Sequence, residues 1–260
     1  MNNPSQWLSV RLARTPADLV AAQHLRYRVF VQELGADGPM VDHQAQLERD
    51  DLDNVVDHLL LVDERRDPSA GNHVVGVYRL LRSEVAAGLG RFYCDEEYDL
   101  APLRAAGRPM LELGRSCIDP AYRGGTGMFI LWNALSDYVL DHGIEILFGV
   151  ASFHGTDIDS LAQPLSWLHH HHLAPLGLRP RARPPYAHSM DIIPAAELER
   201  RAALAALPSL IKAYLRVGGV VGEGAWIDNA FNTTDVFLLM DTAAMSDRHR
   251  KFYQDRWHGA

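Results

Sequence analysis

The sequence predicts an α+β (mixed α/β) fold in which a central, mostly antiparallel sheet carries helices on both faces. Short apolar runs of strand length alternate along the chain with longer amphipathic stretches of helix length. The connections between them are polar and contain proline or glycine, which is typical of turns and loops. The apolar runs are His58–Glu64, His73–Arg82, Ile146–Ser152 and Val236–Met240.

The first part of the chain predicts a strand, a helix and a hairpin. Trp7–Ala13 alternates weakly between apolar and polar residues, which indicates an edge strand or the first strand. Thr15 is a favourable N-cap and is followed by a proline, so we expect a helix over Pro16–Leu34. The runs His58–Glu64 and His73–Arg82 are joined by a polar segment with proline and glycine, which predicts an antiparallel hairpin at the centre of the sheet.

The later part of the chain is more mixed. Ser83–Met110 is interrupted by glycine and proline, and predicts an irregular excursion. We expect helices over Asp157–His172 and Ala195–Leu207, and a strand over Tyr186–Ile193. Gly218–Thr234 is rich in glycine and indicates a second excursion before the last strand. A polar helix is expected at the C-terminus.

Length and composition indicate one domain. With 260 residues, 47% of them hydrophobic, the chain is long enough to bury a large core. We expect a single domain over 1–260, with a core at about 7–193 and an extension at about 194–260 that completes the sheet.

Charge and composition also exclude several classes of function. The net charge of −8 argues against general nucleic-acid binding, which depends on Lys and Arg contacts to phosphates. No apolar run is long enough to span a membrane, and the N-terminus does not resemble a signal peptide. The two cysteines, Cys94 and Cys117, are too few for a disulfide framework, so we expect a cytoplasmic protein.

The stretch Leu111–Gly143 combines an apolar strand, a glycine-rich turn and an amphipathic helix. Its glycines, Gly124, Gly125 and Gly127, fall where the helix begins. The free backbone N–H groups of a helix N-terminus bind phosphate well. This turn therefore predicts a site for a phosphate-bearing carrier.

The strand before this turn carries one acid and one base, Glu112 and Arg115. Burial would raise the pKa of Glu112, which makes it our candidate general base for deprotonating an amine. The alternative is that Glu112 only forms an ion pair with Arg115. Because residues three apart on a regular strand point to opposite faces, a shared site requires a β-bulge near Gly114.

The segment RGGTGM, placed between a strand and a helix, resembles the carrier-binding turn of the GNAT superfamily of N-acyltransferases. Three further segments resemble the branch that contains acyl-homoserine-lactone synthases and the N-acyltransferases of ornithine-lipid synthesis. These segments are LRYRVFVQELGA, ERDDLDNVVDHLLLVD and LELGRSCI. The resemblance implies a GNAT-like fold with the central sheet splayed at a bulged strand, and a C-terminal extension that completes the acyl pocket.

The resemblance also implies the roles of particular residues. The acyl donor's phosphopantetheine arm is expected at Cys117, Ile118, Arg123, Gly124, Gly125, Thr126, Gly127 and Met128. The acceptor's amines and carboxylate are expected at Arg28, Glu48, Asp50, Asp53 and Arg115, where either arginine can clamp the carboxylate. The acids of this set have an alternative interpretation as a solvated acidic loop.

The function implied is transfer of a 3-hydroxyacyl chain from acyl carrier protein to the α-amine of L-ornithine, which gives a lyso-ornithine lipid. No tightly bound cofactor is expected, and peripheral contact with the inner face of the cytoplasmic membrane follows from the lipid product. Acyl carrier protein is acidic, so its docking site is expected to be basic, with Arg179, Arg181 and Arg183 as the best cluster. The alternatives are synthesis of another N-acyl amino acid or of acyl-homoserine lactone, acetyl transfer from acetyl coenzyme A, and a non-catalytic lipid-binding or acyl-carrier-binding role.

Two tempting chemistries are not expected. Cys117 has no neighbouring cation in sequence that would activate its thiol, so we expect a packed and unreactive cysteine. The run His169–His172 lies on a predicted helix, where only residues three or four apart share a face, so we expect no metal there.

Overall fold

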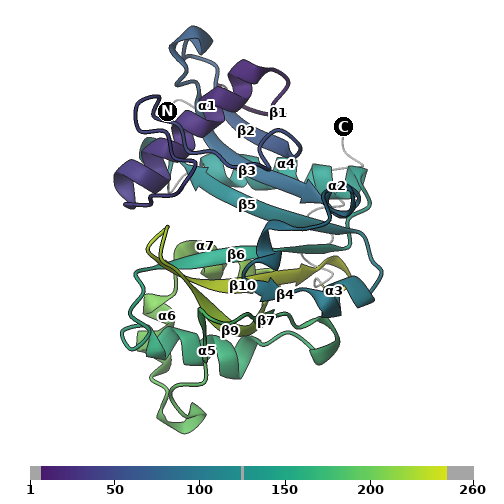
Figure 1. Cartoon of the computed structure of the whole chain (residues 1–260), viewed down its shortest axis with the longest axis vertical. Helices are drawn as coiled ribbons and strands as arrows, with labels where there is room; N and C mark the ends of the chain where they lie inside the picture. The colour runs from purple at the N-terminus through teal and green to yellow at the C-terminus, as the bar shows by residue number, and fades with distance from the viewer. Residues whose placement is uncertain (1–6, 124–125, 245–260) are drawn as a thin grey trace. The chain divides into compact units, whose positions relative to one another are not determined.

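The computed structural model describes residues 7–123 and 126–244 (Figure 1). Its internal contacts divide the chain into two compact units that are interleaved in sequence. The first unit comprises Met1–Gly88 and Glu112–Gly143, and the second comprises Leu89–Leu111 and Ile144–Ala260. No helix within the described ranges is both long and apolar enough to cross a membrane. The helix expected at the C-terminus lies outside the described residues.

The first unit is built on a sheet that contains the predicted hairpin. Antiparallel β2–β3 pairing confirms the hairpin, and β1 pairs antiparallel with β2 at the edge, as expected. From Glu112 onward, β5 belongs to this unit and lies beside β3. The strands in spatial order are β1 (Leu8–Leu12), β2 (Asp57–Asp63), β3 (Val74–Arg82) and β5 (Met110–Ile118).

The expected first helix is present but changes its hydrogen-bonding pattern partway. Thr15 caps α1 (Pro16–Arg26) through a capping box with Asp18, as its sequence predicts. From there the chain continues as a π-helix over Tyr27–Glu33. Such π-helical turns inside helices are often found at functional sites. The change from α-helix to π-helix comes directly after Arg26. Arg26 is a charged residue with no exposed surface.

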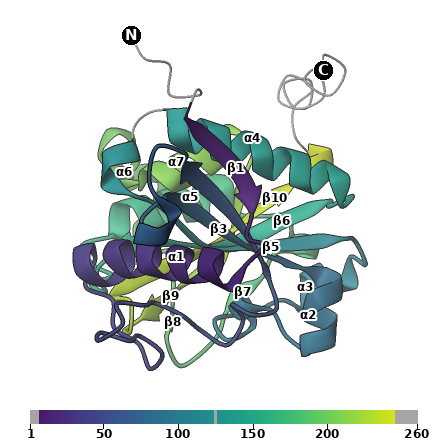
Figure 2. The same cartoon turned by 90° about the horizontal axis from the view of Figure 1, so that it is seen from above.

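Helices α1 and α4 (Thr126–Asp141) cover opposite faces of the first unit's sheet, as Figure 2 shows. Alternate residues of β2 point to opposite faces. Leu60 and Val62 belong to the core cluster that contains α1 residues. Leu61 instead approaches Gly127, at the start of α4, and a Cβ at Gly127 would lie 3.1 Å from Leu61 Cδ2. The predicted two-sided covering of the sheet is therefore present in this unit.

The second unit has its own run of strands. Strand β10 pairs antiparallel with β6 and β9, and β4 pairs antiparallel with β7. Strand β7 pairs parallel with β9, while β8 (Ala187–His188) pairs antiparallel with β9. The spatial order is β6 (Ile146–His154), β10 (Thr233–Asp241), β9 (Val220–Asp228), β7 (Arg181–Ala182) and β4 (Tyr98–Asp99).

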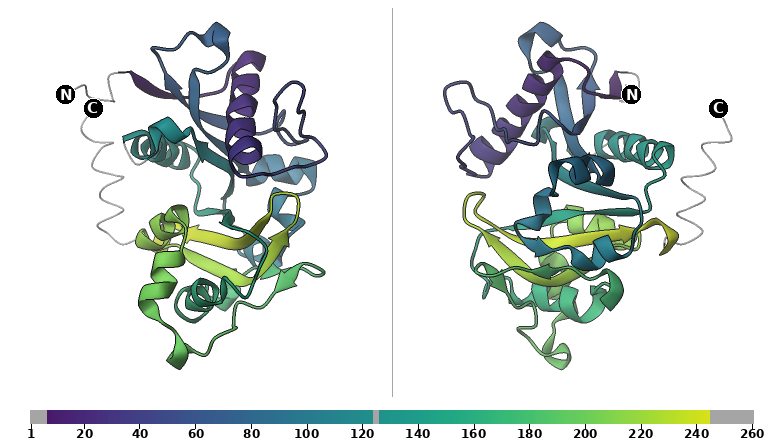
Figure 3. Two further views of the ribbon diagram at one scale, coloured as in Figure 1. Left: turned by 90° about the vertical axis from the view of Figure 1, so that its left-hand side faces the viewer. Right: turned by 45° about the vertical axis from the view of Figure 1, so that its right-hand side comes forward.

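The helices of the second unit pack against this run of strands. Helix α5 contacts both β9 and α6, and Figure 3 shows α5 and α6 side by side in green. Helix α7 contacts β10. The helices are α3 (Ala101–Ala105), α5 (Ala162–His172), α6 (Arg200–Ala206) and α7 (Ser209–Arg216), while α2 (Ser83–Leu89) links the two units in sequence.

Two expectations for the second unit were wrong. Gly218–Thr234 is not an excursion, because most of it forms the nine-residue strand β9. Its glycines are needed for close approach, since a Cβ at Gly222 would lie 2.9 Å from Pro180 O. Conversely, Tyr186–Ile193 holds only the two-residue strand β8. The backbone N–H groups of Asp191 to Ile193 donate to Ser189 and Ser166 hydroxyls, so they are not available to a strand.

Replacement of Gly222 by alanine is expected to destabilise the protein. The added Cβ meets a backbone oxygen and Phe237 Cβ, each at 2.9 Å, and neither is a flexible side-chain end. We expect the free energy of unfolding to fall by about 1–3 kcal/mol. Gly88→Ala is the control, because nothing lies within 4 Å of its built Cβ. Equal denaturant midpoints for the two variants would contradict this account of β9.

Candidate active site

A cluster of three arginines and three carboxylates lies buried in the first unit, and we call it the arginine–acid cluster. Its acids come from the segment that precedes β2, and its arginines come from the end of α1, from β3 and from β5. Its members are Arg26, Glu48, Asp50, Asp53, Arg79 and Arg115. The six formal charges cancel, which is what allows so many ionised groups to be buried together.

Arg26 forms the centre of this cluster. Its Nε donates to Glu48 Oε2 in a short hydrogen bond, and its Nη1 donates to Asp53 Oδ1 at 2.6 Å. The Arg26 side chain is fully buried, with 0% of its surface exposed. A guanidinium with this burial is stable only when carboxylates compensate its charge. Arg26 therefore fixes the positions of Glu48 and Asp53.

The other two arginines link the same acids to the sheet. Arg79 donates to Asp50 through a short contact and lies 3.4 Å from Asp53 Oδ1. Arg115 Nε donates to Glu48 Oε1 at 3.1 Å, and its Nη2 donates to Asp50 Oδ2 at 3.2 Å. Each carboxylate thus contacts two arginines. The cluster ties β3 and β5 to the segment before β2.

The arginines keep the acids ionised. Burial by itself raises the pKa of Glu48, but the charges of Arg115 and Arg26 outweigh it, so the pKa is lowered overall. At Asp50 burial is likewise outweighed, by Arg79 and Arg115, and the pKa falls to about 2. Both groups are therefore carboxylates at neutral pH.

Two neutral side chains complete the surroundings of Asp53. Gln23 Nε2 donates to Asp53 Oδ2 at 2.9 Å, and a His58 ring nitrogen lies 2.9 Å from the Asp53 backbone oxygen. Burial lowers the pKa of His58, which favours the neutral imidazole. His58 is thus a structural partner of this segment and adds no charge to the cluster at neutral pH.

The strand that carries Glu112 is irregular where a shared site requires it. Arg115 has φ 49°, in the left-handed region, which breaks the alternation of β5 at that residue. A Cβ built at Gly114 would lie 3.5 Å from Arg79 Nε, so that face of β5 faces the cluster. Glu112 precedes Gly114 by two residues and lies on the same face, with 3% of its surface exposed. Glu112 and Arg115 therefore share one face, while the catalytic role of Glu112 stays a prediction.

The structure brings most of the predicted acceptor residues together but not all. Glu48, Asp50, Asp53 and Arg115 meet in the cluster, whereas Arg28 lies elsewhere, with Nη2 3.7 Å from Asp119 Oδ2. Sequence reasoning missed Arg26 and Arg79. Arg26 directly follows the buried Leu25, and Arg79 interrupts the apolar run of β3. A charged residue inside an otherwise apolar run is the signal that could have found Arg79, whereas Arg26 lies among polar residues in QHLRYR and has no such signal.

The predicted carrier turn follows β5 directly. Arg123 donates to Glu33 in a bidentate pair at 2.5 and 2.7 Å, and its Nε donates to the Ile118 backbone oxygen at 2.9 Å. Gly124 and Gly125 lie outside the described residues. Thr126 begins α4, so the N–H groups of its first turn have no partner within the helix. Gly127 is required for packing on β2, and Met128 is partly buried.

Cys117 is buried in the core of the first unit, next to the buried Ile118. Burial raises the pKa of the Cys117 thiol to about 12. A thiol with this pKa is protonated at neutral pH and is a poor nucleophile. The side chain therefore has the properties expected of a packing residue.

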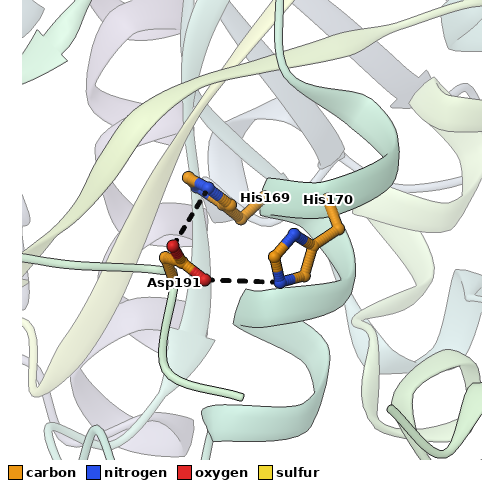
Figure 4. A group of neighbouring side chains, drawn as sticks. All are labelled: His169, His170 and Asp191. Atoms are coloured by element: carbon orange, nitrogen blue, oxygen red, sulfur yellow. Dashed lines mark ion pairs between the residues drawn. The ribbon is translucent and has the colours of Figure 1, made fainter. Parts of the chain in front are cut away.

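The histidine run differs from its expected geometry. His169 and His170 are adjacent on α5, yet both approach the carboxylate of Asp191, at 3.8 and 3.3 Å (Figure 4). The expectation that only residues three or four apart converge was wrong, because Asp191 belongs to a separate segment and reaches both rings. His170 also hydrogen-bonds the Ile193 backbone oxygen at 3.0 Å, so the group fastens the segment around Asp191 to α5.

The segment that carries this cluster matches a known protein family. Residues 25–133, which include the whole arginine–acid cluster, match the Acetyltransferase (GNAT) domain family. The chain is 62% identical over 250 residues to the L-ornithine N(alpha)-acyltransferase of Rhodobacter capsulatus, covering 96% of both chains. It is 40% identical to the protein of the same name from Brucella abortus, covering 95% of this chain and 88% of the relative. The chain belongs to this family of GNAT-type acyltransferases.

Solved structures with a similar fold include synthases of acyl-homoserine lactones. The CoA-dependent synthase BjaI, solved with SAM and isopentyl-CoA, has a TM-score of 0.50 at 16% identity, covering 96% of this chain and 89% of that one. The CoA-dependent synthase MesI has a TM-score of 0.50 at 14% identity, covering 95% of both chains. At these identities the likeness concerns the fold.

Removal of the Arg26 charge is expected to be strongly destabilising. Arg26→Met removes the main counter-charge of the buried Asp53 and one of the two arginines paired with Glu48, which should lower the free energy of unfolding by about 3–5 kcal/mol. Arg49→Met removes an exposed pair with Asp42 and should cost less than about 1 kcal/mol. Chemical denaturation measures both. A cost for Arg26→Met as small as that for Arg49→Met would contradict the central role of Arg26.

The Cys117 thiol is expected to resist alkylation in the native protein. With its pKa raised to about 12 by burial, the thiolate fraction at pH 8 is on the order of one in ten thousand. Iodoacetamide labelling read by peptide mass spectrometry should therefore be slow in buffer and fast in urea. Rapid labelling of the folded protein at Cys117, with Cys94 unlabelled as the internal control, would contradict the burial.

Proposed function

We propose that this protein transfers a 3-hydroxyacyl chain from acyl carrier protein to the α-amine of L-ornithine, giving a lyso-ornithine lipid. The names of the relatives support the acceptor and the reaction. The observation that carries the proposal is the left-handed conformation of Arg115, which places Arg115 on the same face of β5 as the buried Glu112. A carboxylate and a guanidinium on one face of a strand suit an α-amino acid, which carries an amine and a carboxylate on one carbon.

In this mechanism Glu112 is the general base. Its carboxylate accepts a proton from the acceptor's α-ammonium, and the resulting amine attacks the thioester carbonyl. The new C–N bond forms, the C–S bond breaks, and the carrier's thiolate leaves. The proton lost by the amine during attack passes to the thiolate. Atoms and charges balance without a further reactant.

Arg115 binds the acceptor's carboxylate in this scheme, and the arginine–acid cluster positions Arg115. Glu48 and Asp50 each accept one of its hydrogen bonds, which leaves the guanidinium little freedom to reorient. The acids of the cluster are engaged with arginines. We therefore assign Glu48, Asp50 and Asp53 to the positioning of Arg115, and Arg28 to a position near the carrier turn, where it approaches Asp119.

The donor in this proposal is a thioester on acyl carrier protein, whose phosphopantetheine phosphate binds at the N-terminus of α4. Arg123, the last described residue before that helix, is held by a bidentate pair with Glu33. Docking of the acidic carrier at Arg179, Arg181 and Arg183 would compete with nearby acids, because Arg181 lies 3.2 Å from Glu223 and Arg183 lies 3.8 Å from Asp99. We place the reaction in the cytoplasm, at the inner face of the membrane that receives the lipid product.

Glu112→Gln tests the proposed base. The amide keeps the shape of the side chain but accepts no proton, so kcat with acyl carrier protein and ornithine should fall about 100-fold to 1,000-fold. Turnover is measured by mass spectrometry of the acylated amino acid. Glu84→Gln, an exposed acid of the same unit, is the control.

The same assay separates the alternatives. Carrier binding by Glu112→Gln should remain near that of the unmodified protein, since the phosphate site is distinct from the base. An N-acyl product with another amino acid, or lactone formation from SAM, would show that the acceptor is not ornithine. Acetyl transfer from acetyl coenzyme A would redirect the donor, and absence of turnover with every acceptor would favour a binding protein.

A further inference from the structure

Two histidines and one aspartate of the second unit bring three metal-ligating side chains to one point. His169 and His170 lie on α5, and Asp191 lies in the segment that follows β8. Each residue offers one ligand atom, and the three atoms lie within 4.8 Å of one another. Figure 4 shows both imidazole rings next to the Asp191 carboxylate. The proposed mechanism does not use these three residues, which we call the His–Asp group.

The position of the histidines on α5 explains why adjacent residues face one segment. Ser166 lies three residues before His169 and four before His170, and residues at both spacings are neighbours on a helix surface. Ser166 is fully buried, and its Oγ accepts the N–H groups of the two residues after Asp191, at 3.1 and 3.0 Å. The face of α5 that carries Ser166 therefore contacts this segment. The reason for expecting no metal at the histidine run, that neighbouring rings diverge, does not apply at this face.

Backbone contacts hold Asp191 beside the two rings. Its N–H donates to Ser189 Oγ at 3.0 Å, and the next two N–H groups donate to Ser166. The backbone oxygen of Ile193 lies 3.0 Å from His170 Nε2. The hydrogen bonds to the two serines do not involve the carboxylate, so a ligand on its oxygens leaves them intact. A ligand set that is positioned in advance binds an ion more tightly, because less ordering is needed on binding.

The distances between the ligand atoms suit a tetrahedral zinc ion. Asp191 Oδ1 lies 3.3 Å from His170 Nε2, and Asp191 Oδ2 lies 3.8 Å from His169 Nε2. Ligand atoms about 2.0–2.1 Å from a tetrahedral Zn²⁺ are about 3.3 Å apart. The observed separations equal or slightly exceed this value, so small side-chain rotations bring the atoms to one ion. Imidazole nitrogens and a carboxylate oxygen are also ordinary ligands of Zn²⁺.

The contacts of His170 favour a cation at this point. Its Nε2 faces two acceptors, Asp191 Oδ1 at 3.3 Å and the Ile193 backbone oxygen at 3.0 Å. A neutral imidazole has a single N–H to offer to both of them. A Zn²⁺ ion takes the place of that proton, and both oxygens then lie next to positive charge. The ion also neutralises the Asp191 carboxylate, which has no arginine or lysine partner within the described chain.

The His–Asp group is accessible to an ion from solvent. The side chains of His169 and His170 expose 24% and 21% of their surface, and that of Asp191 exposes 56%. Three protein ligands leave one position of a tetrahedral Zn²⁺ for water. The two thiols of the chain, Cys94 and Cys117, are buried and do not compete for the ion. The group therefore meets the requirements for ligand type, spacing and an entry path.

We infer that His169, His170 and Asp191 bind one Zn²⁺ ion, with water as the remaining ligand. The ion fastens the segment after β8 to α5, in addition to the hydrogen bonds that Ser166 accepts from it. This site goes beyond the proposed acyl transfer, because none of its residues takes part in that reaction. Its test accordingly needs no acyl donor or acceptor.

Calorimetric titration of the EDTA-treated protein with zinc chloride tests the site. Asp191→Asn keeps the shape of the side chain but removes its charge, and should raise the Kd for zinc at least tenfold, since even loss of a group that supports a metal ligand costs about 10–100-fold. His169→Gln should weaken binding by at least as much. The matched control is His171→Gln, which makes the same change at an exposed neighbour and should leave the Kd unchanged.

Amide hydrogen exchange measures the fastening of the segment. The N–H groups of Ile192 and Ile193 donate to Ser166 only while the segment stays on α5. Zinc should therefore slow their exchange in the unmodified protein and in His171→Gln. In Asp191→Asn, zinc should have no such effect at the same concentration.

Three results would overturn the inference. The first is a Kd for zinc of about 1 mM or weaker in the unmodified protein. The second is zinc affinity that Asp191→Asn leaves unchanged, or that His171→Gln lowers as much as His169→Gln does. Either finding would show that the histidine run captures the ion without the aspartate. The third is zinc binding that leaves the exchange of Ile192 and Ile193 unaltered.

Discussion

The full burial of the Arg26 guanidinium is the constraint on which the first unit depends. A charge without exposed surface has to be compensated nearby, and Glu48 and Asp53 provide that compensation. Because Glu48 also accepts a hydrogen bond from Arg115, the compensation of Arg26 determines where the Arg115 side chain of β5 lies. A substitution at Arg26 would thus affect both the stability of the unit and the geometry of the site.

Regular secondary structure would not build this arrangement, and two local departures from it are decisive. Directly after Arg26 the helix changes from α to π, which alters the direction of every later side chain in that segment. At Arg115 the left-handed backbone breaks the alternation of β5. A non-glycine residue in this conformation is strained by roughly 1–3 kcal/mol, and strain of this kind collects at functional sites. The ion pairs of Arg115 with Glu48 and Asp50 oppose that strain.

Patterns with a direct local cause could be predicted from the sequence. The capping of α1 at Thr15 and the β2–β3 hairpin depend on neighbouring residues, and both are present. The requirement for an irregular strand near Gly114 also followed from spacing alone. Strand β9 could not be predicted, because its glycines are explained by Pro180 and Phe237, which are distant in sequence. Arg26 was passed over for a similar reason, since its partners lie more than twenty residues away.

The role of a buried carboxylate depends on which charged or polar groups neighbour it. The neighbouring groups differ between the buried acids of the first unit and those of the second. In the first unit each acid contacts arginines that lower its pKa. The charges of this cluster cancel, so its role is structural. In the second unit, burial and then the charges of Glu97 and Asp235 raise the pKa of the Tyr98 phenol. Nearby negative charge raises the pKa of a phenol because it disfavours the phenolate. Acids that neutralise buried arginines add rigidity, because removal of either partner leaves a buried charge without compensation.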